Sequence, residues 1–376
     1  MRQDERYTAM KIGIVGCGNI SDIYLKNLTT VFENTTVYAV CDLDTAKAET
    51  QAKKYNIAKV LALDEMLADP DVEIILNITT PKTHYEICKK ALLAGKHVYV
   101  EKPLSISYCE GAELLSLAKE RGLYIGGAPD TFLGAGIQTA IDLIESGAIG
   151  KPVGGAAYML CPGHESWHPS PEFYYDIGGG PLFDMGPYYI TALVRLLGPV
   201  KSVYAAGTKA FQERTITSKP KFGKKIPVKV DTHNVGILSF ENGALVTLVT
   251  SFDVIAHTMP NIELYGTEGS IKVPDPNKFG GSVQLATREE RQFTDVPLIS
   301  KYSENSRGIG IAEMILAINE SRTSNASGEL ALHVLEIMEA FLKSSERGAP
   351  VFIESVPSPE IKLNWNVEIG ELKTNK

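Results

Sequence analysis

A glycine-rich turn near the start of the chain has the residue types that bind a dinucleotide. Gly16-Cys17-Gly18-Asn19-Ile20-Ser21 lies between an apolar strand pattern and an amphipathic helix pattern. Gly16 permits a tight turn, Gly18 lets the backbone approach a pyrophosphate, and Ser21 is small enough for close packing of helix on strand. The helix N-terminus adds N–H groups for the phosphates. We therefore predict that Gly16, Gly18, Asn19 and Ile20 contact a nicotinamide dinucleotide.

Asp42 is the candidate for the adenosine ribose. It directly follows the second predicted strand, where a carboxylate accepts hydrogen bonds from both ribose hydroxyls and repels a 2′-phosphate. No arginine adjoins it in the sequence, and the nearest base is Lys47. This pattern favours NAD, with NADP as the alternative cofactor. The other interpretation is that Asp42 caps the following helix, as Asp44 could also do.

A later strand ends in hydroxyl side chains that suit the nicotinamide side of such a site. Thr79-Thr80-Pro81 follows the strand at the edge where doubly wound sheets bind ligands. Pro81 stops the strand, and all three residues are predicted to line the cofactor. His84 is a further candidate, or alternatively an ordinary residue in the first turn of a helix.

Glu101-Lys102-Pro103 supplies a candidate base at the end of the next strand. A lysine in a partly desolvated cleft has its pKa lowered toward the range useful for proton transfer. Lys102 would take the proton from a reacting hydroxyl while a hydride leaves for the nicotinamide, with Glu101 beside the cofactor. The alternative is a solvated Glu–Lys pair on a loop, without a catalytic role.

An aromatic loop in the second half suits a sugar. Residues 164–175 are rich in Trp, His, Tyr and Pro. Aromatic faces cover the C–H surface of a sugar ring, and His or Tyr side chains bind its hydroxyls. His168 is the predicted substrate-binding member of this loop. The alternative is a surface loop that packs on its own domain.

Metal and disulfide chemistry are not predicted. Cys161-x-x-His164-x-x-x-His168 superficially suggests a metal site, but Pro162 and Gly163 oppose the helix that this spacing would need. The five cysteines are odd in number and scattered, which is typical of a reducing compartment rather than of a disulfide framework.

The elements that must position these residues follow a βαβ order over residues 1–128. Strand patterns alternate with helix patterns, and Gly95 and Gly122 stand where helix C-caps fall. The alternation indicates a parallel, doubly wound sheet, and hence an α/β fold with an N-terminal Rossmann domain. The strands are predicted over Ile12–Val15, Val37–Cys41, near Val60, Glu73–Ile78, His97–Val100 and Leu123–Ile125, and the helices over Ile20–Phe32, Thr45–Tyr55, Thr83–Ala94 and Tyr108–Lys119.

Residues 129–376 are predicted to form an α+β domain with a large, mainly antiparallel sheet. Its strands include Asn234–Phe240 and Ala244–Phe252, which flank an Asn-Gly hairpin signal, and residues 265–270 mark another turn. A sheet with helices on one face leaves the other open, which predicts a homodimer or homotetramer. The segment after Pro357 shows no clear pattern. Helices are predicted over Gln138–Ser146, Pro181–Leu197, Gly308–Glu320 and Glu329–Ser345.

Length and charge exclude several classes of protein. A chain of 376 residues exceeds what one hydrophobic core usually organises, so two domains are expected. The net charge of -8 argues against a nucleic-acid partner. No apolar run approaches the length of a membrane span, and the polar start lacks the core of a signal peptide. We therefore expect a soluble, cytoplasmic protein with no membrane partner.

Together the motifs resemble the glucose–fructose oxidoreductase/inositol dehydrogenase (Gfo/Idh/MocA) family, in the family's order and over nearly the whole chain. The resemblance implies Lys102 as the principal catalytic residue, on a cis bond before Pro103 that would aim it at the substrate. It also implies Asp184 as a substrate-positioning or acid–base group, and places Asp130 and Thr131 against the nicotinamide; a hinge without ligand contact is the rival interpretation there. The motifs are Gly16-x-Gly18-x-x-Ser21, Asp42, Thr80-Pro81-x-x-x-Tyr85, Ala94-Gly95-Lys96-His97-Val98, Glu101-Lys102-Pro103, Gly178-Gly179-Gly180-Pro181-Leu182-Phe183-Asp184-Met185-Gly186 and Tyr265-Gly266-Thr267-Glu268-Gly269.

The chain departs from the family where its pattern often continues Asp-x-Gly-x-His-x-x-Asp. Here Tyr188 occupies the His position and Thr191 the final Asp position. On one continuous helix Asp184 and Tyr188 share a face, and a phenol beside a lysine can relay a proton. Tyr188 is therefore a candidate catalytic and substrate-binding residue, with core packing as the alternative.

The leading hypothesis is an NAD(P)-dependent oxidoreductase that acts on a secondary alcohol or ketone of a sugar, cyclitol or sugar derivative. Lys102, Asp184 and Tyr188 would be its catalytic residues and, with His168, would bind the substrate. One rival is an enzyme that cleaves glycosides through transient oxidation by NAD. Another is a non-catalytic, dinucleotide-binding sensor of the same fold, against which the retention of Lys102 and Asp184 argues.

Overall fold

The computed structural model describes residues 8–374, which divide into two compact units. The first unit comprises the chain up to Gly134, Ile299–Leu332 and the segment from Val356 onward; the second comprises Ala135–Leu298 and His333–Ser355. The units therefore interleave along the chain, because two later segments return to the first unit. The expected division into residues 1–128 and 129–376 stays a prediction.

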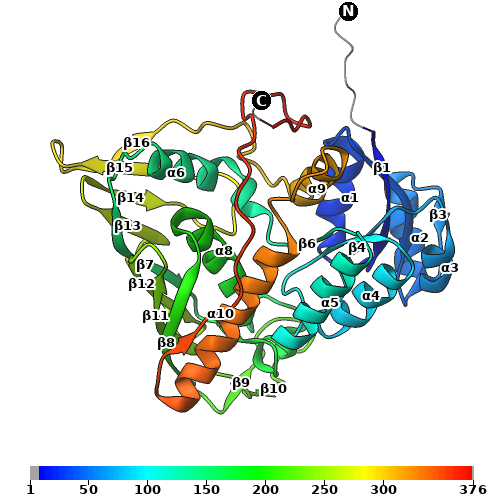
Figure 1. Cartoon of the computed structure of the whole chain (residues 1–376). Helices are drawn as coiled ribbons and strands as arrows, with labels where there is room; N and C mark the ends of the chain where they lie inside the picture. The colour runs from blue at the N-terminus through cyan, green and yellow to red at the C-terminus, as the bar shows by residue number, and fades with distance from the viewer. Residues whose placement is uncertain (1–7, 375–376) are drawn as a thin grey trace, which may run out of the picture. The chain divides into compact units, whose positions relative to one another are not determined.

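The first unit contains a six-stranded parallel sheet in the order β3-β2-β1-β4-β5-β6 (Figure 1). Every residue of β4 is buried, as expected for a parallel strand covered on both faces. The predicted doubly wound α/β fold is confirmed. The strands are β1 (Met10–Val15), β2 (Thr35–Cys41), β3 (Lys59–Val60), β4 (Ile74–Asn77), β5 (His97–Val100) and β6 (Ile125–Gly127), and the helices between them are α1 (Ser21–Thr30), α2 (Thr45–Tyr55), α3 (Leu63–Ala68), α4 (Pro81–Leu93) and α5 (Tyr108–Glu120).

Two glycines end helices of this unit as predicted. Gly95 follows the last turn of α4 with φ 77°, and Gly122 follows α5 with φ 64°. A left-handed residue just past a helix is the usual C-cap conformation, and glycine adopts it without a steric cost. Helix α3 was not predicted, because its six residues are too few to show a helical period.

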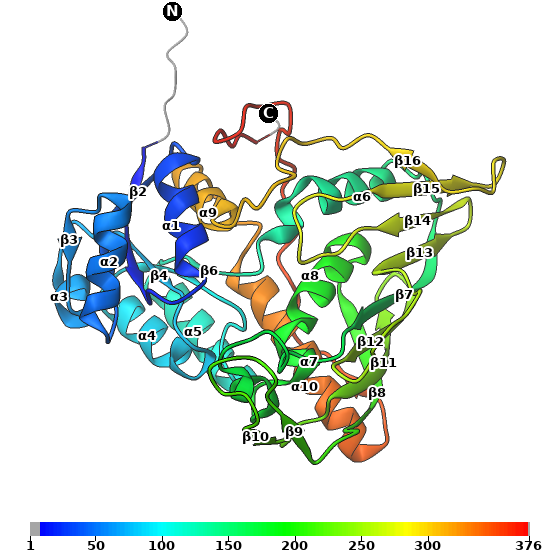
Figure 2. The same ribbon diagram turned by 180° about the vertical axis from the view of Figure 1, so that it is seen from behind.

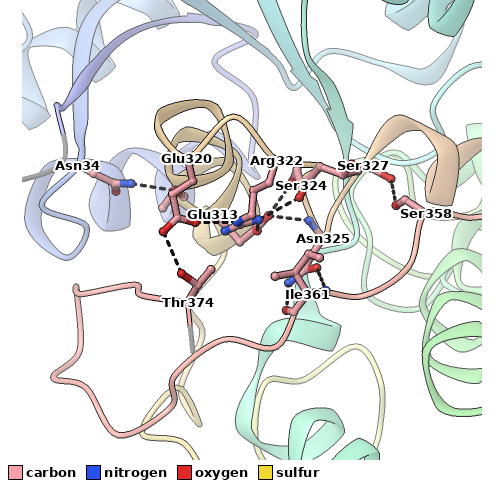
Figure 3. A network of polar contacts seen from close by, with 12 residues as sticks. Asn34, Glu313, Glu320, Arg322, Ser324, Asn325, Ser327, Ser358, Ile361 and Thr374 are labelled. Atoms are coloured by element: carbon pink, nitrogen blue, oxygen red, sulfur yellow. Dashed lines mark hydrogen bonds and ion pairs between the residues drawn. The ribbon is translucent and has the colours of Figure 1, made fainter. Parts of the chain in front are cut away.

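A polar network holds the segment after Val356 on the first unit (Figure 3). The side chain of Glu313 in α9 (Ile309–Asn319) is fully buried, and it accepts hydrogen bonds from Arg322, Ser324 and the Asn325 N–H at 2.6, 2.6 and 2.8 Å. The Asn325 amide then binds both the N–H and the carbonyl of Ile361, at 2.7 and 2.8 Å. These contacts give an ordered place to a segment whose sequence showed no pattern.

The second unit contains a nine-stranded sheet in the order β16-β15-β14-β13-β7-β12-β11-β8-β17. β7 and β12 pair in parallel, and the other neighbours in this sheet pair antiparallel, so the predicted mainly antiparallel sheet is confirmed. The Asn242-Gly243 turn joins β11 and β12 as expected. The strands are β7 (Pro152–Leu160), β8 (Val200–Thr208), β11 (His233–Phe240), β12 (Leu245–Ser251), β13 (Ile262–Gly266), β14 (Gly269–Val273), β15 (Val283–Thr287), β16 (Thr294–Val296) and β17 (Val351–Phe352); β9 (Glu213–Thr215) and β10 (Lys225–Pro227) form a separate ribbon.

Helices cover one face of this sheet. Figures 1 and 2 both show α6 (Ala135–Glu145) and α8 (Gly186–Leu197) on the same side of the strands, and Figure 2 shows α7 (Gly180–Asp184) there as well. The single helix predicted over Pro181–Leu197 is wrong: it breaks at Met185, and Pro187 lacks the N–H that a continuous helix would use. Helix α10 (Gly328–Arg347) begins in the first unit and continues in the second. No helix among residues 8–374 is long and apolar enough to cross a membrane.

Candidate active site

The glycine-rich turn connects β1 to α1 and has two glycines with different local constraints. Gly16 has φ 106°, and a Cβ there would lie 2.8 Å from the carbonyl oxygen of Ile78. Gly18 is exposed, and a Cβ there would meet no protein atom within 4 Å. Protein packing thus explains Gly16 but not Gly18, whereas the close approach of a pyrophosphate explains Gly18. The turn therefore fits a dinucleotide.

Asp42 ties this turn to the end of β2. Its two carboxylate oxygens accept the N–H groups of Cys17 at 2.7 Å and of Asp44 at 2.8 Å. The helix-capping interpretation is not what the structure shows, because the N-cap residue of α2 is Asp44 and no side chain caps it. Each carboxylate oxygen of Asp42 has a second lone pair, so the ribose contact remains chemically available.

Asn77 organises the end of β4, and the sequence analysis missed it. Its fully buried side-chain oxygen accepts the Thr79 hydroxyl at 2.7 Å, and its amide nitrogen donates to the His84 carbonyl at 3.2 Å. Thr80 is exposed at the N-cap of α4, and Pro81 is the first residue of that helix. The sequence signal that could have identified Asn77 is a single amide side chain at the end of the otherwise apolar strand β4. The cofactor contacts of Thr79, Thr80 and Pro81 stay predictions.

His84 joins the ends of two strands. It is fully buried, and its ring nitrogens face the carbonyl oxygens of Pro103 at 2.7 Å and Thr79 at 3.2 Å. Burial lowers the pKa of His84, while the two carbonyls that face its ring act in the opposite direction. These contacts connect the segments that follow β4 and β5, and the contact of His84 with the cofactor stays a prediction.

Glu101 and Lys102 follow β5 and are not a solvated pair. Glu101 is 9 % exposed; it accepts the Tyr24 hydroxyl at 2.8 Å and the Lys102 N–H at 3.0 Å. The peptide bond between Lys102 and Pro103 is cis, as the resemblance implied. The backbone that carries Lys102 is therefore fixed from both sides, by Glu101 before it and by His84 after it.

Asp130 has a structural partner in the first unit. Its carboxylate is 1 % exposed and accepts the N–H groups of Gly308 and Gly310 at 2.8 and 3.1 Å, at the N-terminus of α9. Burial raises the pKa of Asp130 to about 6. The geometry explains Asp130 as a helix-terminus anchor, while its contact with the nicotinamide stays a prediction.

In the second unit Asp184 lies beside a histidine that the sequence analysis did not select. The Nε2 atom of His164 is 3.2 Å from Oδ2 of Asp184, and the two side chains are 11 % and 17 % exposed. Tyr188 is 8 % exposed and lies beyond the helix break, so the shared helical face predicted for Asp184 and Tyr188 does not follow from this backbone. The predicted catalytic residues divide between the units, with Lys102 in the first and Asp184 and Tyr188 in the second.

His168 lies in the same loop as His164, among the aromatic rings of Trp167, Phe173 and Tyr174. Its Nδ1 atom accepts the Ser170 N–H at 3.0 Å, and its ring packs edge-on against Trp167 and Tyr174. Burial lowers the pKa of His168. Among residues 8–374 no group of three or more His, Cys, Asp or Glu side chains is arranged to hold a metal ion.

Comparisons with known proteins cover most of the chain. Residues 10–126 match the model described as "Oxidoreductase family, NAD-binding Rossmann fold", and residues 137–272 match the GFO/IDH/MocA C-terminal domain. The dTDP-3,4-didehydro-2,6-dideoxy-alpha-D-glucose 3-reductase of Saccharopolyspora spinosa is 30% identical over 289 residues, 75% of this chain and 80% of its own. The myo-inositol 2-dehydrogenase of Thermotoga maritima is 26% identical over 264 residues, 70% of this chain and 74% of its own.

Solved structures share the fold. Levoglucosan dehydrogenase in complex with NADH and L-sorbose has a TM-score of 0.79 at 22% identity, over 92% of this chain and 99% of its own. The aldose-aldose oxidoreductase of Caulobacter crescentus has a TM-score of 0.77 at 21% identity, over 92% of this chain and 100% of its own.

Proposed function

Because the chain belongs to the GFO/IDH/MocA family of NAD-binding oxidoreductases, we propose that it transfers a hydride between NAD and a secondary alcohol or ketone of a sugar, cyclitol or sugar derivative. The observation that carries the proposal is Lys102, held at the end of β5 on the edge of the dinucleotide-binding sheet. Relatives named as an inositol dehydrogenase and a sugar-nucleotide reductase support the substrate class.

The residues of the first unit bind and orient the cofactor. The turn at Gly16 and Gly18 receives the pyrophosphate, and Asp42 receives the adenosine ribose, which favours NAD over NADP. NAD, when bound, supplies the carbon that accepts the hydride. Thr79, Thr80, Pro81 and Glu101 line the nicotinamide side, while His84 and Asp130 act through the backbone segments that they hold.

Lys102 handles the proton of the reacting hydroxyl. In the direction of oxidation its neutral amine accepts this proton while the hydride leaves the same carbon; in reduction the ammonium returns it. The carboxylate of Asp184, with Tyr188 and His168 as further contacts, orients the substrate. Oxidation needs the unprotonated amine, so the rate of oxidation should rise with pH until Lys102 is neutral.

The test compares Lys102→Met with Lys119→Met, an exposed lysine on α5, over a panel of aldoses and inositols with NAD and NADP. We expect Lys102→Met to reduce kcat by at least about 10²-fold, the contribution typical of a positioned acid–base group, while NAD still binds. Full turnover by Lys102→Met would overturn the proposal. Retention of NAD through purification, with hydrolysis of nitrophenyl glycosides, would replace it by the glycoside-cleaving reaction.

We also propose that the uncovered face of the nine-stranded sheet forms a homodimer or homotetramer. Tyr204 on β8 is 51% exposed and pairs with Ile237 on β11, which is 44% exposed; Leu245 on β12 is 55% exposed. Exposed apolar side chains on neighbouring strands are typical of an interface. Ile237→Lys should lower the mass measured by light scattering and Phe222→Lys, in a loop, should not. A monomeric unmodified protein at working concentration would refute the proposal.

A further inference from the structure

The hydroxyl of Tyr24 connects helix α1 to the carboxylate that precedes Lys102. The phenol O–H donates to Oε1 of Glu101 at 2.8 Å, and Oε2 of the same carboxylate accepts the Lys102 N–H at 3.0 Å. All three residues belong to the first unit. One carboxylate therefore joins a helix to the peptide group of the proposed base.

Burial makes the hydrogen bond between Tyr24 and Glu101 important to both partners. The Tyr24 side chain is fully buried, and Glu101 is 9% exposed. In such surroundings a phenol without an acceptor costs free energy, and a carboxylate without donors costs more. Burial and the carboxylate of Glu101 raise the pKa of Tyr24, so the phenol keeps its proton and donates it to a carboxylate that can only accept.

The N-terminal end of α1 is fastened to the glycine-rich turn. Ser21, the first residue of the helix, binds the Gly18 carbonyl through its N–H at 3.0 Å and through its hydroxyl at 2.6 Å. Tyr24 follows within the first turn of the helix. The place of the phenol is therefore set by the same segment that forms the dinucleotide turn.

A second buried residue holds α1 on the face that carries Tyr24. Asn27 is three residues later, so it lies on the same side of the helix. Its amide donates to the carbonyl oxygens of Asn305 and Arg307, at 2.9 and 2.8 Å, in the segment before α9. The helix cannot slide or rotate without breaking these contacts, so the Tyr24 hydroxyl has a fixed position relative to the end of β5.

The peptide group of Lys102 depends on a side chain because it lies beyond the sheet. β5 ends at Val100, and the N–H of Glu101 still bonds the Asn77 carbonyl of the neighbouring strand at 2.9 Å. The next N–H, that of Lys102, bonds the Glu101 side chain instead of a strand. The orientation of this peptide group therefore follows the position of the carboxylate, which Tyr24 holds at its other oxygen.

We propose that Tyr24 is a positioning residue for the reaction: through Glu101 it fixes the backbone of Lys102 and thereby the reach of the lysine amine. This inference rests on the proposed function of Lys102 and adds a residue to it. Tyr24 acts through Glu101 rather than by contact with the substrate or the cofactor. A displaced base slows the transfer of the proton and leaves binding nearly unchanged, so loss of the hydroxyl should lower kcat rather than weaken binding.

Tyr24→Phe removes one oxygen atom, and Tyr55→Phe is its matched control. The Tyr55 hydroxyl also bonds a carboxylate of α1, Oδ1 of Asp22, at 2.8 Å. With a substrate that the unmodified protein oxidises, Tyr24→Phe should lower kcat about tenfold or more, while the KM for this substrate and the Kd for NAD change by less than about twofold. Tyr55→Phe should leave all three constants unchanged.

Hydrogen exchange of the Lys102 amide tests the inference without turnover. In the ligand-free protein this amide should exchange about threefold to tenfold faster in Tyr24→Phe, because the carboxylate that accepts its N–H has lost its other donor. Tyr55→Phe should leave the rate unchanged. Mass spectrometry of overlapping peptides around residue 102 measures it.

A double variant tests whether Tyr24 acts through Glu101. Glu101→Leu removes the carboxylate, so adding Tyr24→Phe to it should lower kcat no further, although each single variant lowers it. Losses that multiply would show another route. Should Tyr24→Phe fail to fold, this comparison still applies, because two apolar partners leave no buried polar group without a partner.

The outcomes distinguish this inference from the proposed function. Turnover of no member of the panel, or full turnover by Lys102→Met, would overturn both. An inactive Lys102→Met together with an unchanged kcat or an unchanged Lys102 exchange rate in Tyr24→Phe would overturn the inference and leave the proposed function standing. So would a rise in the Kd for NAD that matches the loss of kcat, because Tyr24 would then act on the dinucleotide turn.

Discussion

Alanine at Gly16 and at Gly18 should separate the two reasons for glycine in the dinucleotide turn. At Gly16 the φ of 106° lies where L side chains are strained, and the new Cβ would meet the Ile78 carbonyl oxygen at 2.8 Å and its carbon at 2.9 Å. At Gly18 the backbone is not in that region, and no protein atom lies within 4 Å of the new Cβ. The first substitution should therefore affect the fold and the second the cofactor.

The two effects have different magnitudes in the ligand-free protein. Backbone strain at Gly16 costs about 1–3 kcal/mol, and the clash with Ile78 adds about 1–3 kcal/mol, for a total of about 2–6 kcal/mol. At about 2–4 °C per kcal/mol for a unit of this size, Tm should fall by roughly 4–24 °C. Gly18→Ala should leave Tm within about 2 °C, as expected for an unpacked surface position.

Differential scanning calorimetry without ligand and titration calorimetry with NAD measure the two effects. Gly18→Ala should raise the Kd for NAD about tenfold or more, because its Cβ occupies the space through which the pyrophosphate approaches. A normal Kd in Gly18→Ala would show that the phosphates bind elsewhere. A normal Tm in Gly16→Ala would refute the strain argument.

Three further predictions concern charge. Glu313→Gln should lower the free energy of unfolding, measured in urea, by about 2–4 kcal/mol, because the buried carboxylate that accepts hydrogen bonds from Arg322, Ser324 and Asn325 becomes an amide with only one acceptor atom. Glu368→Gln, on an exposed carboxylate, should change it by less than about 0.5 kcal/mol, and equal midpoints for the two variants would contradict this prediction. Burial lowers the pKa of His333 from 6.5 to about 4, so the contribution of its neutral ring to stability is complete above pH 6.5. About 3 kcal/mol of the free energy of unfolding should be lost as the pH falls from 6.5 to 4. His333→Gln should flatten the plot of unfolding free energy against pH over this range. Asp42→Asn removes the charge that repels a 2′-phosphate, so the ratio of kcat/KM for NADP to that for NAD should rise about tenfold or more, and an unchanged ratio would remove Asp42 from cofactor selection.

The sequence predicts best where local chemistry decides the backbone. Strand β5 and helix α2 have the bounds that their patterns predicted. Gly95 and Gly122 end their helices because glycine adopts a positive φ without steric strain. The prediction of one helix over Pro181–Leu197 was wrong, because the helix breaks at Met185. The hydrophobic pattern continues through the break, and only Pro187, which lacks an N–H, indicates it in the sequence.

The site was harder to predict where partners come from distant parts of the chain. Lys102 and the glycine-rich turn are visible because short motifs carry their chemistry. The contact between His164 and Asp184 is not, because it depends on a loop conformation that Arg214 imposes from a strand about fifty residues later. The role of Asn77 could not be predicted either, because the sequence does not show that its amide bonds Thr79 and His84.

The return of later segments to the first unit has a consequence for synthesis of the protein. Helix α9 packs on β6, and Asn325 hydrogen-bonds Ile361 in the segment after Val356. Both segments are synthesised long after the strands of the parallel sheet. Between Gly134 and the last described residues lie about 240 residues, which take roughly 10–50 s to translate. For about the first 185 of these residues the nascent NAD-binding sheet lacks α9, which packs on β6 in the folded protein. The first unit is therefore the first to be started and the last to be completed, and chaperones that bind nascent chains can act on it throughout this interval.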